Sequence, residues 1–138
     1  MAELRRMTIK ISSFKAYDIR GQLPHEINSE IAYRVGNATA KYLSAKKMIL
    51  GRDIRASSKE LSESMASGLM DAGVDVIDIG ECGTENVYYA TGVLESCGGI
   101  MVTASHNPTD YNGFKIVSEN AKPISSETGL LDIRKIAE

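Results

Sequence analysis

The sequence predicts an α/β fold of three layers, α/β/α, with helices on both faces of a mixed, mostly parallel sheet. Short apolar stretches alternate along the chain with longer stretches whose apolar residues recur every three to four positions. This alternation is typical of βαβ units, whose crossover helices bury both faces of a parallel sheet. The length of 138 residues and the ordinary apolar fraction fit a single domain.

The first two predicted helices have amphipathic stripes and start signals. Apolar residues at helical spacing predict a helix over residues 28–44, with Asn28 as its N-cap. Ser57 and Glu60 have the spacing of a capping box ahead of a second stripe, which Gly73 ends.

Two further helices are expected in the second half of the chain. Thr84 is placed to cap the third, and Ser125 or Ser126 to cap the last. The apolar stripe of the last helix continues to the final residue, Glu138. A chain that ends with a helix still in phase looks cut, so we expect a piece of a longer protein.

The expected strands lie between these helices. Four apolar segments predict them, at residues 48–51, 74–80, 98–103 and 114–117. In open α/β sheets, ligands bind at the carboxyl ends of the strands. This rule places the loop at residues 52–55 and Ser105 at the same edge of the sheet.

The composition disfavours several classes of function. Sixteen basic and eighteen acidic residues give a formal net charge of -2, which leaves no basic footprint for nucleic acid or an anionic membrane. No apolar run approaches the roughly 20 residues of a membrane helix, so we expect a soluble, cytoplasmic protein. Cys82 and Cys97 are too few for a disulfide framework or a zinc site, and we expect both to be buried.

One polar turn concentrates reactive side chains. An apolar strand opens there into Ser105 and His106, and a rigid element that aims exposed loop residues is a common setting for chemistry. Ser105 is therefore the first candidate. Arg52, Asp53 and Arg55 follow another strand, and we expect them to form a structural ion-pair cluster.

Phosphoryl transfer fits this turn better than hydrolysis does. The G-x-S-x-G elbow of many serine hydrolases is absent around Ser105, and His106 is adjacent in sequence, so its side chain points away. Phosphoryl transfer needs a hydroxyl that carries phosphate and cations that offset its charge. Arg20 and Lys115 are candidates for those cations.

Three motifs in order resemble the first domain of the α-D-phosphohexomutases, from about residue 12 to residue 138. They are FKAYDIRG at residues 14–21, GRD at 51–53 followed by Arg55, and TASHNP at 103–108 with DYNGFK at 110–115. Two further segments look most like the bacterial phosphomannomutases that feed GDP-mannose synthesis, GTENVYYAT at 83–91 and KPIS at 122–125.

The resemblance implies a phosphoserine enzyme, an intramolecular phosphotransferase that interconverts mannose 6-phosphate and mannose 1-phosphate. Ser105 would pass its phosphate to a hexose monophosphate and regain the other phosphate of the bisphosphate intermediate. Hexose 1,6-bisphosphate is the implied activator. Phosphoglucomutase or dual activity stays open as an alternative, as does a non-catalytic domain that binds sugar phosphates.

The resemblance also implies roles for individual residues. The phosphate on Ser105 would be one ligand of Mg²⁺, the others being three aspartates on the family's second domain. Arg20 and Lys115 match positions near the phosphoserine and the proton-transfer site, and His106 matches a position that contacts substrate. Tyr17 lies at the edge of the site. Either Lys115 or His106 transfers the proton.

We expect residues 1–138 to be domain I of a four-domain enzyme. The D-G-D-x-D-R metal loop, the sugar-reading loop and the phosphate-binding loop of the family's other domains do not occur in this sequence. The expected partners are the hexose phosphate substrate and those remaining domains, without nucleic acid or membrane. The 138 residues alone are expected to be inactive, because remote binding energy positions the reacting end of the sugar.

Overall fold

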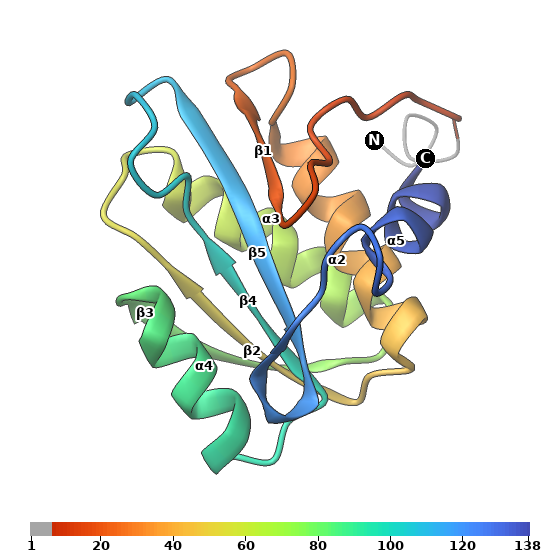
Figure 1. Ribbon diagram of the computed structural model, residues 1–138, viewed down its shortest axis with the longest axis vertical. Coiled ribbons are helices and arrows are strands. Elements are labelled where there is room, and N and C mark those ends of the chain that lie inside the picture. The colour runs from red at the N-terminus through yellow and green to blue at the C-terminus, as the bar shows by residue number, and fades with distance from the viewer. Residues whose placement is uncertain (1–6) are drawn as a thin grey trace.

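A β-sheet lies between two layers of helices in the computed structural model, which describes residues 7–138 (Figure 1). Its strands are β1 (Ile19–Gln22), β2 (Lys47–Arg52), β3 (Asp75–Glu81), β4 (Gly98–Val102), β5 (Tyr111–Ser118) and β6 (Lys122–Pro123). Their order across the sheet is β1-β5-β4-β2-β3, with β6 beside β5. The predicted α/β/α layering is confirmed.

The sheet is mixed as expected, but its parallel part is smaller than expected. Strand β2 pairs in parallel with β3 and β4, whereas β5 pairs antiparallel with β4, β1 and β6. Parallel pairs therefore do not predominate among the described strands. The difference comes from β1 and β6, which contain four and two residues and are too short to have a recognisable alternation.

Three helices cover one face of the sheet and a fourth covers part of the other. The helices are α2 (Ser29–Leu43), α3 (Ser58–Asp71), α4 (Thr84–Val93) and α5 (Leu130–Ala137), with a 3-10 turn, η1 (Glu119–Ala121), after β5. Alternate residues of β2 divide the core: Met48 and Leu50 pack with α2, α3 and α5, and Ile49 packs with Val87 of α4. Figure 1 shows α4 on the near side of the sheet.

The predicted cap of α2 is confirmed, whereas the predicted cap of α3 is wrong. The Asn28 side-chain oxygen accepts a hydrogen bond from the Ile31 N–H at 2.9 Å. Ser57 stands at the N-cap of α3 but makes no capping hydrogen bond with its side chain. Its hydroxyl instead accepts a hydrogen bond from the Asn112 amide at 2.8 Å, so a contact with β5 replaces the capping box.

The other two caps are glycines rather than Thr84 and Ser125 or Ser126. Helix α4 starts after Gly83, whose N–H donates to the side-chain oxygen of Asn86 at 2.8 Å. Helix α5 starts after Gly129, because the Ser125 carbonyl accepts from the N–H groups of Thr128 and Leu130 and folds the segment into a turn first.

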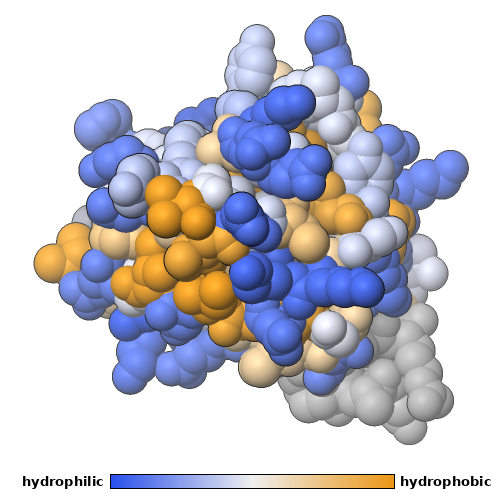
Figure 2. Space-filling view, turned by 90° about the horizontal axis from the view of Figure 1, so that it is seen from below, coloured by the Kyte–Doolittle hydropathy of each residue, from blue (hydrophilic) through white to orange (hydrophobic). Residues whose placement is uncertain are grey.

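Both cysteines are free and half-buried, so the expectation of full burial is wrong. Burial raises the pKa of the Cys82 thiol above its ordinary value. Within residues 7–138, no helix combines the length and the apolar character needed to cross a membrane. The face seen from below shows one larger hydrophobic area and smaller ones among hydrophilic side chains (Figure 2).

Candidate functional site

Ser105 lies on an exposed loop just beyond the carboxyl end of β4. Its backbone is in the left-handed region, with φ 56°, a conformation that costs a non-glycine residue roughly 1 kcal/mol. Two hydrogen bonds hold it there: the Ser105 N–H donates to Thr103 Oγ1 at 3.0 Å, and the Ser105 carbonyl accepts from Arg55 Nη2 at 3.0 Å. The hydroxyl is thus open to solvent on a fixed backbone.

The loop after β2 supports this serine from the neighbouring strand. Asp53 Oδ2 accepts a hydrogen bond from Thr103 Oγ1 at 2.8 Å, and Thr103 in turn holds the Ser105 amide. Asp53 Oδ1 accepts from the Arg55 N–H at 3.0 Å and from the Ser58 hydroxyl at 2.5 Å. The expectation that residues 52–55 and Ser105 share one edge of the sheet is confirmed.

Arg55 binds the main chain of the Ser105 loop at four points. Its Nη1 donates to the carbonyls of Pro108 at 2.6 Å and Tyr111 at 3.0 Å, and its Nη2 donates to those of Ser105 at 3.0 Å and Asn107 at 2.6 Å. The guanidinium also pairs with Asp53, with Nε 3.4 Å from Oδ2. The expected ion pair is therefore present, and we call this arrangement the Arg55 clamp.

Arg20 and Lys115 come together on adjacent strands, joined by a residue that sequence reasoning left unassigned. Arg20 of β1 lies opposite Gly113 of β5, two residues before Lys115. Arg20 Nε donates to Asp18 Oδ1 at 2.9 Å, and Lys115 Nζ donates to Asp18 Oδ2 at 3.2 Å. One carboxylate thus holds both predicted cations.

This cation pair lies near the same edge as Ser105. The Gly113 carbonyl accepts from the Thr103 N–H at 2.9 Å, so Arg20 of β1, Gly113 of β5 and Thr103, the residue after β4, follow one another across the sheet edge. Lys115 lies opposite Met101, which packs against α4, so Lys115 is on the α4 side of the sheet. Among residues 7–138, neither cation forms a hydrogen bond or ion pair with the Ser105 side chain.

Helix α4 adds Tyr88 to the Asp18 cluster. Burial, and then the negative charge of Asp18, raise the pKa of the Tyr88 phenol above its ordinary value. Sequence reasoning missed both residues as members of the site. The only available signal was that each lies inside a quoted motif, FKAYDIRG for Asp18 and GTENVYYAT for Tyr88.

His106 and Tyr17 are exposed, as Ser105 is. His106 is exposed on the loop beside Ser105, and the Tyr17 side chain is 81% exposed just before Asp18. Both are accessible to a ligand at this edge.

The residues present can supply only part of a Mg²⁺ site. Mg²⁺ prefers oxygen ligands, and a phosphate on the exposed Ser105 would offer them. Among the described residues, no group of three or more His, Cys, Asp or Glu side chains is arranged to hold a metal ion. This part of the chain therefore fits the role of contributing a phosphate ligand to a metal held by other groups.

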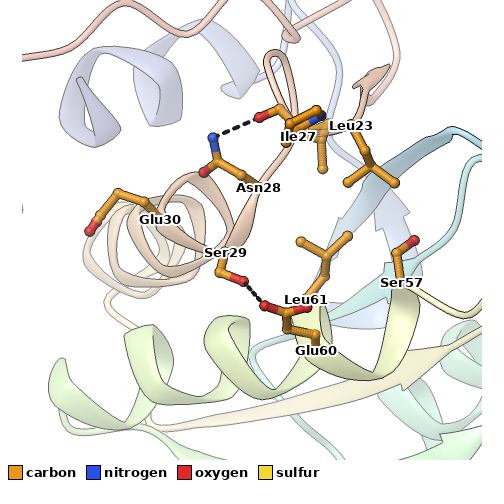
Figure 3. Close-up of a pocket in the computed structure, with 9 residues that line it drawn as sticks. Leu23, Ile27, Asn28, Ser29, Glu30, Ser57, Glu60 and Leu61 are labelled. Carbon is orange, nitrogen blue, oxygen red and sulfur yellow. Dashed lines mark hydrogen bonds between the residues drawn. The ribbon is translucent and has the colours of Figure 1, made fainter.

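A cavity of about 370 Å³ lies beside this edge but is not lined by the predicted site residues. It lies between the start of α2 and the start of α3 (Figure 3), where the Ser29 hydroxyl donates to Glu60 at 3.0 Å. Ser57 lines the cavity and also contacts Asn112 of β5. Ser105, His106 and Tyr17 are exposed outside this cavity.

Comparisons with known proteins identify the family of this chain. Residues 12–138 match the family described as "Phosphoglucomutase/phosphomannomutase, alpha/beta/alpha domain I". A phosphomannomutase of Klebsiella pneumoniae is 56% identical over 129 residues, which cover 94% of this chain and 82% of that protein. A phosphomannomutase of Escherichia coli is 56% identical over 129 residues, which cover 94% of this chain and 28% of that protein.

A solved structure gives the same result. A phosphoglucomutase/phosphomannomutase family protein from Burkholderia thailandensis superposes with a TM-score of 0.86 at 34% identity, covering 94% of this chain and 30% of that one. The chain thus spans less than a third of the Escherichia coli and Burkholderia thailandensis proteins. From its fold, its motifs and these matches, the chain belongs to the phosphoglucomutase/phosphomannomutase family, as its α/β/α domain I.

Proposed function

We propose that this chain is the phosphoserine domain of a phosphohexomutase that interconverts mannose 6-phosphate and mannose 1-phosphate. The observation that carries the proposal is the exposed Ser105, fixed at φ 56° by Thr103 and the Arg55 clamp. The names of the similar proteins, phosphomannomutases from several bacteria, support mannose as the sugar.

In the proposed reaction, Ser105 carries a phosphate that it exchanges with the substrate. The bond between Ser105 Oγ and phosphorus breaks as a hydroxyl oxygen of the hexose monophosphate bonds to the phosphorus. Lys115 or His106 relays the proton of that hydroxyl to Ser105 Oγ, which leaves as a neutral hydroxyl. The resulting hexose 1,6-bisphosphate then returns its other phosphate to Ser105 Oγ, and the proton of the Ser105 hydroxyl passes by the same relay to the sugar oxygen that is released.

The charges of this chain support that chemistry. A serine phosphate carries roughly -1.5 to -2 charges at neutral pH. Arg20 and Lys115 supply positive charge near the same edge, and Arg55 binds four carbonyls of the loop that carries Ser105. When bound, Mg²⁺ would supply Lewis-acid neutralisation of the transferring group, with the phosphate on Ser105 as its ligand from this chain.

A hybrid enzyme tests the proposal. This chain replaces the matched segment of the Escherichia coli phosphomannomutase, and mass spectrometry follows phosphate on Ser105 after exposure to glucose 1,6-bisphosphate. Interconversion of the two mannose phosphates is measured in parallel, with glucose phosphates as the competing pair. We expect phosphate on Ser105, interconversion of the mannose phosphates, and loss of both in Ser105→Ala.

The controls separate the alternatives. The unmodified Escherichia coli enzyme calibrates the assays, and the isolated chain is exposed to the same bisphosphate. Turnover by Ser105→Ala at the rate of its parent would refute the phosphoserine role. Binding of hexose phosphate by a folded hybrid whose Ser105 never gains phosphate would favour a non-catalytic domain.

A further inference from the structure

Asp18 lies at the centre of the cation pair, and no role has been given to it so far. We propose that Asp18 is a positioning residue, which holds Arg20 and Lys115 so that their remaining donors face the phosphate during transfer. The proposal deepens the proposed function of Ser105 and rests on it.

The first support is the division of the Asp18 carboxylate between two cations. Oδ1 accepts from Arg20 Nε at 2.9 Å, and Oδ2 accepts from Lys115 Nζ at 3.2 Å. The Asp18 side chain is only 7% exposed, whereas those of Arg20 and Lys115 are 43% and 29% exposed. The carboxylate is therefore anchored inside the protein while the two cations reach solvent.

The second support is the rigidity of the segment that carries Asp18. The Asp18 carbonyl accepts from the Lys15 N–H at 2.8 Å, and the Arg20 N–H donates to the Ser13 carbonyl at 2.9 Å. Phe14 and Ile19 pair across the same turn. The carboxylate is thus attached to a tight, hydrogen-bonded turn that leads directly into β1.

The third support is the set of donors that Asp18 leaves available. A guanidinium has five N–H donors and an ammonium has three. Asp18 binds Arg20 through Nε, and among the described residues the two terminal nitrogens of Arg20 have no hydrogen-bond partner. A pair of terminal guanidinium nitrogens matches two phosphate oxygens, so the contact with Asp18 leaves the phosphate-binding side of Arg20 open.

The test begins with the isolated chain and nuclear magnetic resonance. The Arg20 Nε–H and Lys115 ammonium signals are compared between the parent, Asp18→Asn and Asp18→Glu, with Asp75→Asn as the control because Asp75 is exposed at the start of β3. We expect both signals to shift and to exchange faster with water in Asp18→Asn, to return in part in Asp18→Glu, and to stay unchanged in Asp75→Asn.

The second stage measures turnover in the hybrid enzyme. We expect Asp18→Asn to lower kcat about tenfold to 100-fold, because misplaced catalytic groups cost that much, with a smaller change in KM. In a Lys115→Met background the same change should cost much less, since residues that act through one another are not additive. Asp18→Glu should recover part of kcat even if Asp18→Asn lowers the melting temperature.

The outcomes distinguish this proposal from the proposed function. Unshifted Arg20 and Lys115 signals in Asp18→Asn would overturn the role of Asp18. So would a loss of kcat on Asp18→Asn that is equally large in the parent and in the Lys115→Met background. A parent hybrid that folds but never carries phosphate on Ser105 would overturn the proposed function instead, whatever the signals of the isolated chain show.

Discussion

Gly113 is the residue that lets β1 lie close against β5 at the cation pair. A Cβ at this position would lie 3.0 Å from both Cα and Cγ of Arg20, and would collide with the Ile19 carbonyl. We expect Gly113→Ala to lower the free energy of unfolding by about 1–3 kcal/mol, as overpacking does, and to displace Arg20. Urea denaturation measures the first effect and the Arg20 Nε–H signal the second.

Gly92 is the matched control for this substitution. It lies on the exposed side of α4, and a Cβ there would have nothing within 4 Å. Gly92→Ala should therefore stabilise the protein, by about 0.5–1 kcal/mol, through the better helix propensity of alanine. An equal decrease in the free energy of unfolding of Gly113→Ala and Gly92→Ala would contradict the packing explanation.

The ionisation of Tyr88 reports the charge on Asp18. Burial is the larger cause of the raised Tyr88 pKa, and the Asp18 charge is the next. We expect Asp18→Asn to lower the Tyr88 pKa part of the way toward the ordinary value of 10.0, observed as an earlier shift of the tyrosine Cζ resonance during an alkaline titration. A pKa that rises, or does not move, would count against the proximity of the two groups.

The raised Tyr88 pKa also determines how the stability of the protein changes with pH. Because folding raises the Tyr88 pKa, the neutral phenol is favoured in the folded state. Its contribution to stability is complete below the unfolded pKa and is lost as pH rises through the higher folded pKa. Alkaline unfolding should therefore depend on Tyr88, and Tyr88→Phe should weaken that dependence.

Some residues of the candidate site could be predicted from the sequence and others could not. Ser105 was recognisable because a polar turn followed an apolar strand, and the structure places it there on an exposed loop. Asp18 was not recognisable, because its partner Lys115 is 97 residues away in the chain. No spacing rule relates two such positions before the antiparallel pairing of β1 with β5 is known.

At the scale of elements, the start of α2 depends on the side chain of Asn28. Its Oδ1 accepts from the Ile31 N–H at 2.9 Å, and its Nδ2 donates to the Pro24 carbonyl at 3.1 Å. We expect Asn28→Ala to cost about 1 kcal/mol in thermal unfolding, the usual effect of losing an N-cap. Asn28→Asp keeps the capping oxygen and should cost less, and the reverse order would contradict the capping role.

The connection between β4 and β5 depends on the Arg55 clamp. Lysine has no planar fork, so it cannot reach four carbonyls at once. We expect Arg55→Lys to lower stability by about 1–3 kcal/mol, because partly buried carbonyls lose their donors, and to speed hydrogen exchange of the Ser105 amide. Arg52→Lys is the control, since Arg52 pairs only loosely with Asp78, at 3.8 Å.

Long helices and strands with a clear apolar period were predictable from the sequence. A very short strand was not, and neither was a cap whose side chain bonds elsewhere. The helix expected over residues 28–44 is observed at Ser29–Leu43, and the strand expected over 98–103 at Gly98–Val102. Strand β1 has only four residues, too few for a period to be read. The predicted capping hydrogen bond of Ser57 is absent because the Ser57 hydroxyl accepts from Asn112, a residue distant in the sequence.

At the scale of the whole molecule, Ser105 is exposed at the open edge of the sheet, and Arg20 and Lys115 near the same edge are half-buried. We expect the isolated 138 residues to show no mutase turnover, because the described residues hold no complete metal site and remote binding energy normally positions the sugar. A coupled assay with both mannose phosphates, Mg²⁺ and hexose 1,6-bisphosphate measures this. Turnover that copurifies with the chain and disappears in Ser105→Ala would contradict it.

The layered architecture followed from the sequence, whereas the arrangement of the site did so only in part. Helices alternating with strands implied three layers because each amphipathic face needs a partner. The order of strands decides which loops meet, and only part of that order was implied by the sequence. Hence Asp53 and Ser105 were expected at one edge, while the cluster around Asp18 was not.

The Arg55 clamp also bears on how this loop can change during evolution or engineering. Within residues 105–111, Arg55 binds main-chain carbonyls only, so these contacts do not depend on which side chains the loop carries. The exposed side chains of His106 and Thr109 can therefore be varied while the Arg55 contacts are kept. A library at these two positions would vary the surroundings of Ser105 on an unchanged backbone.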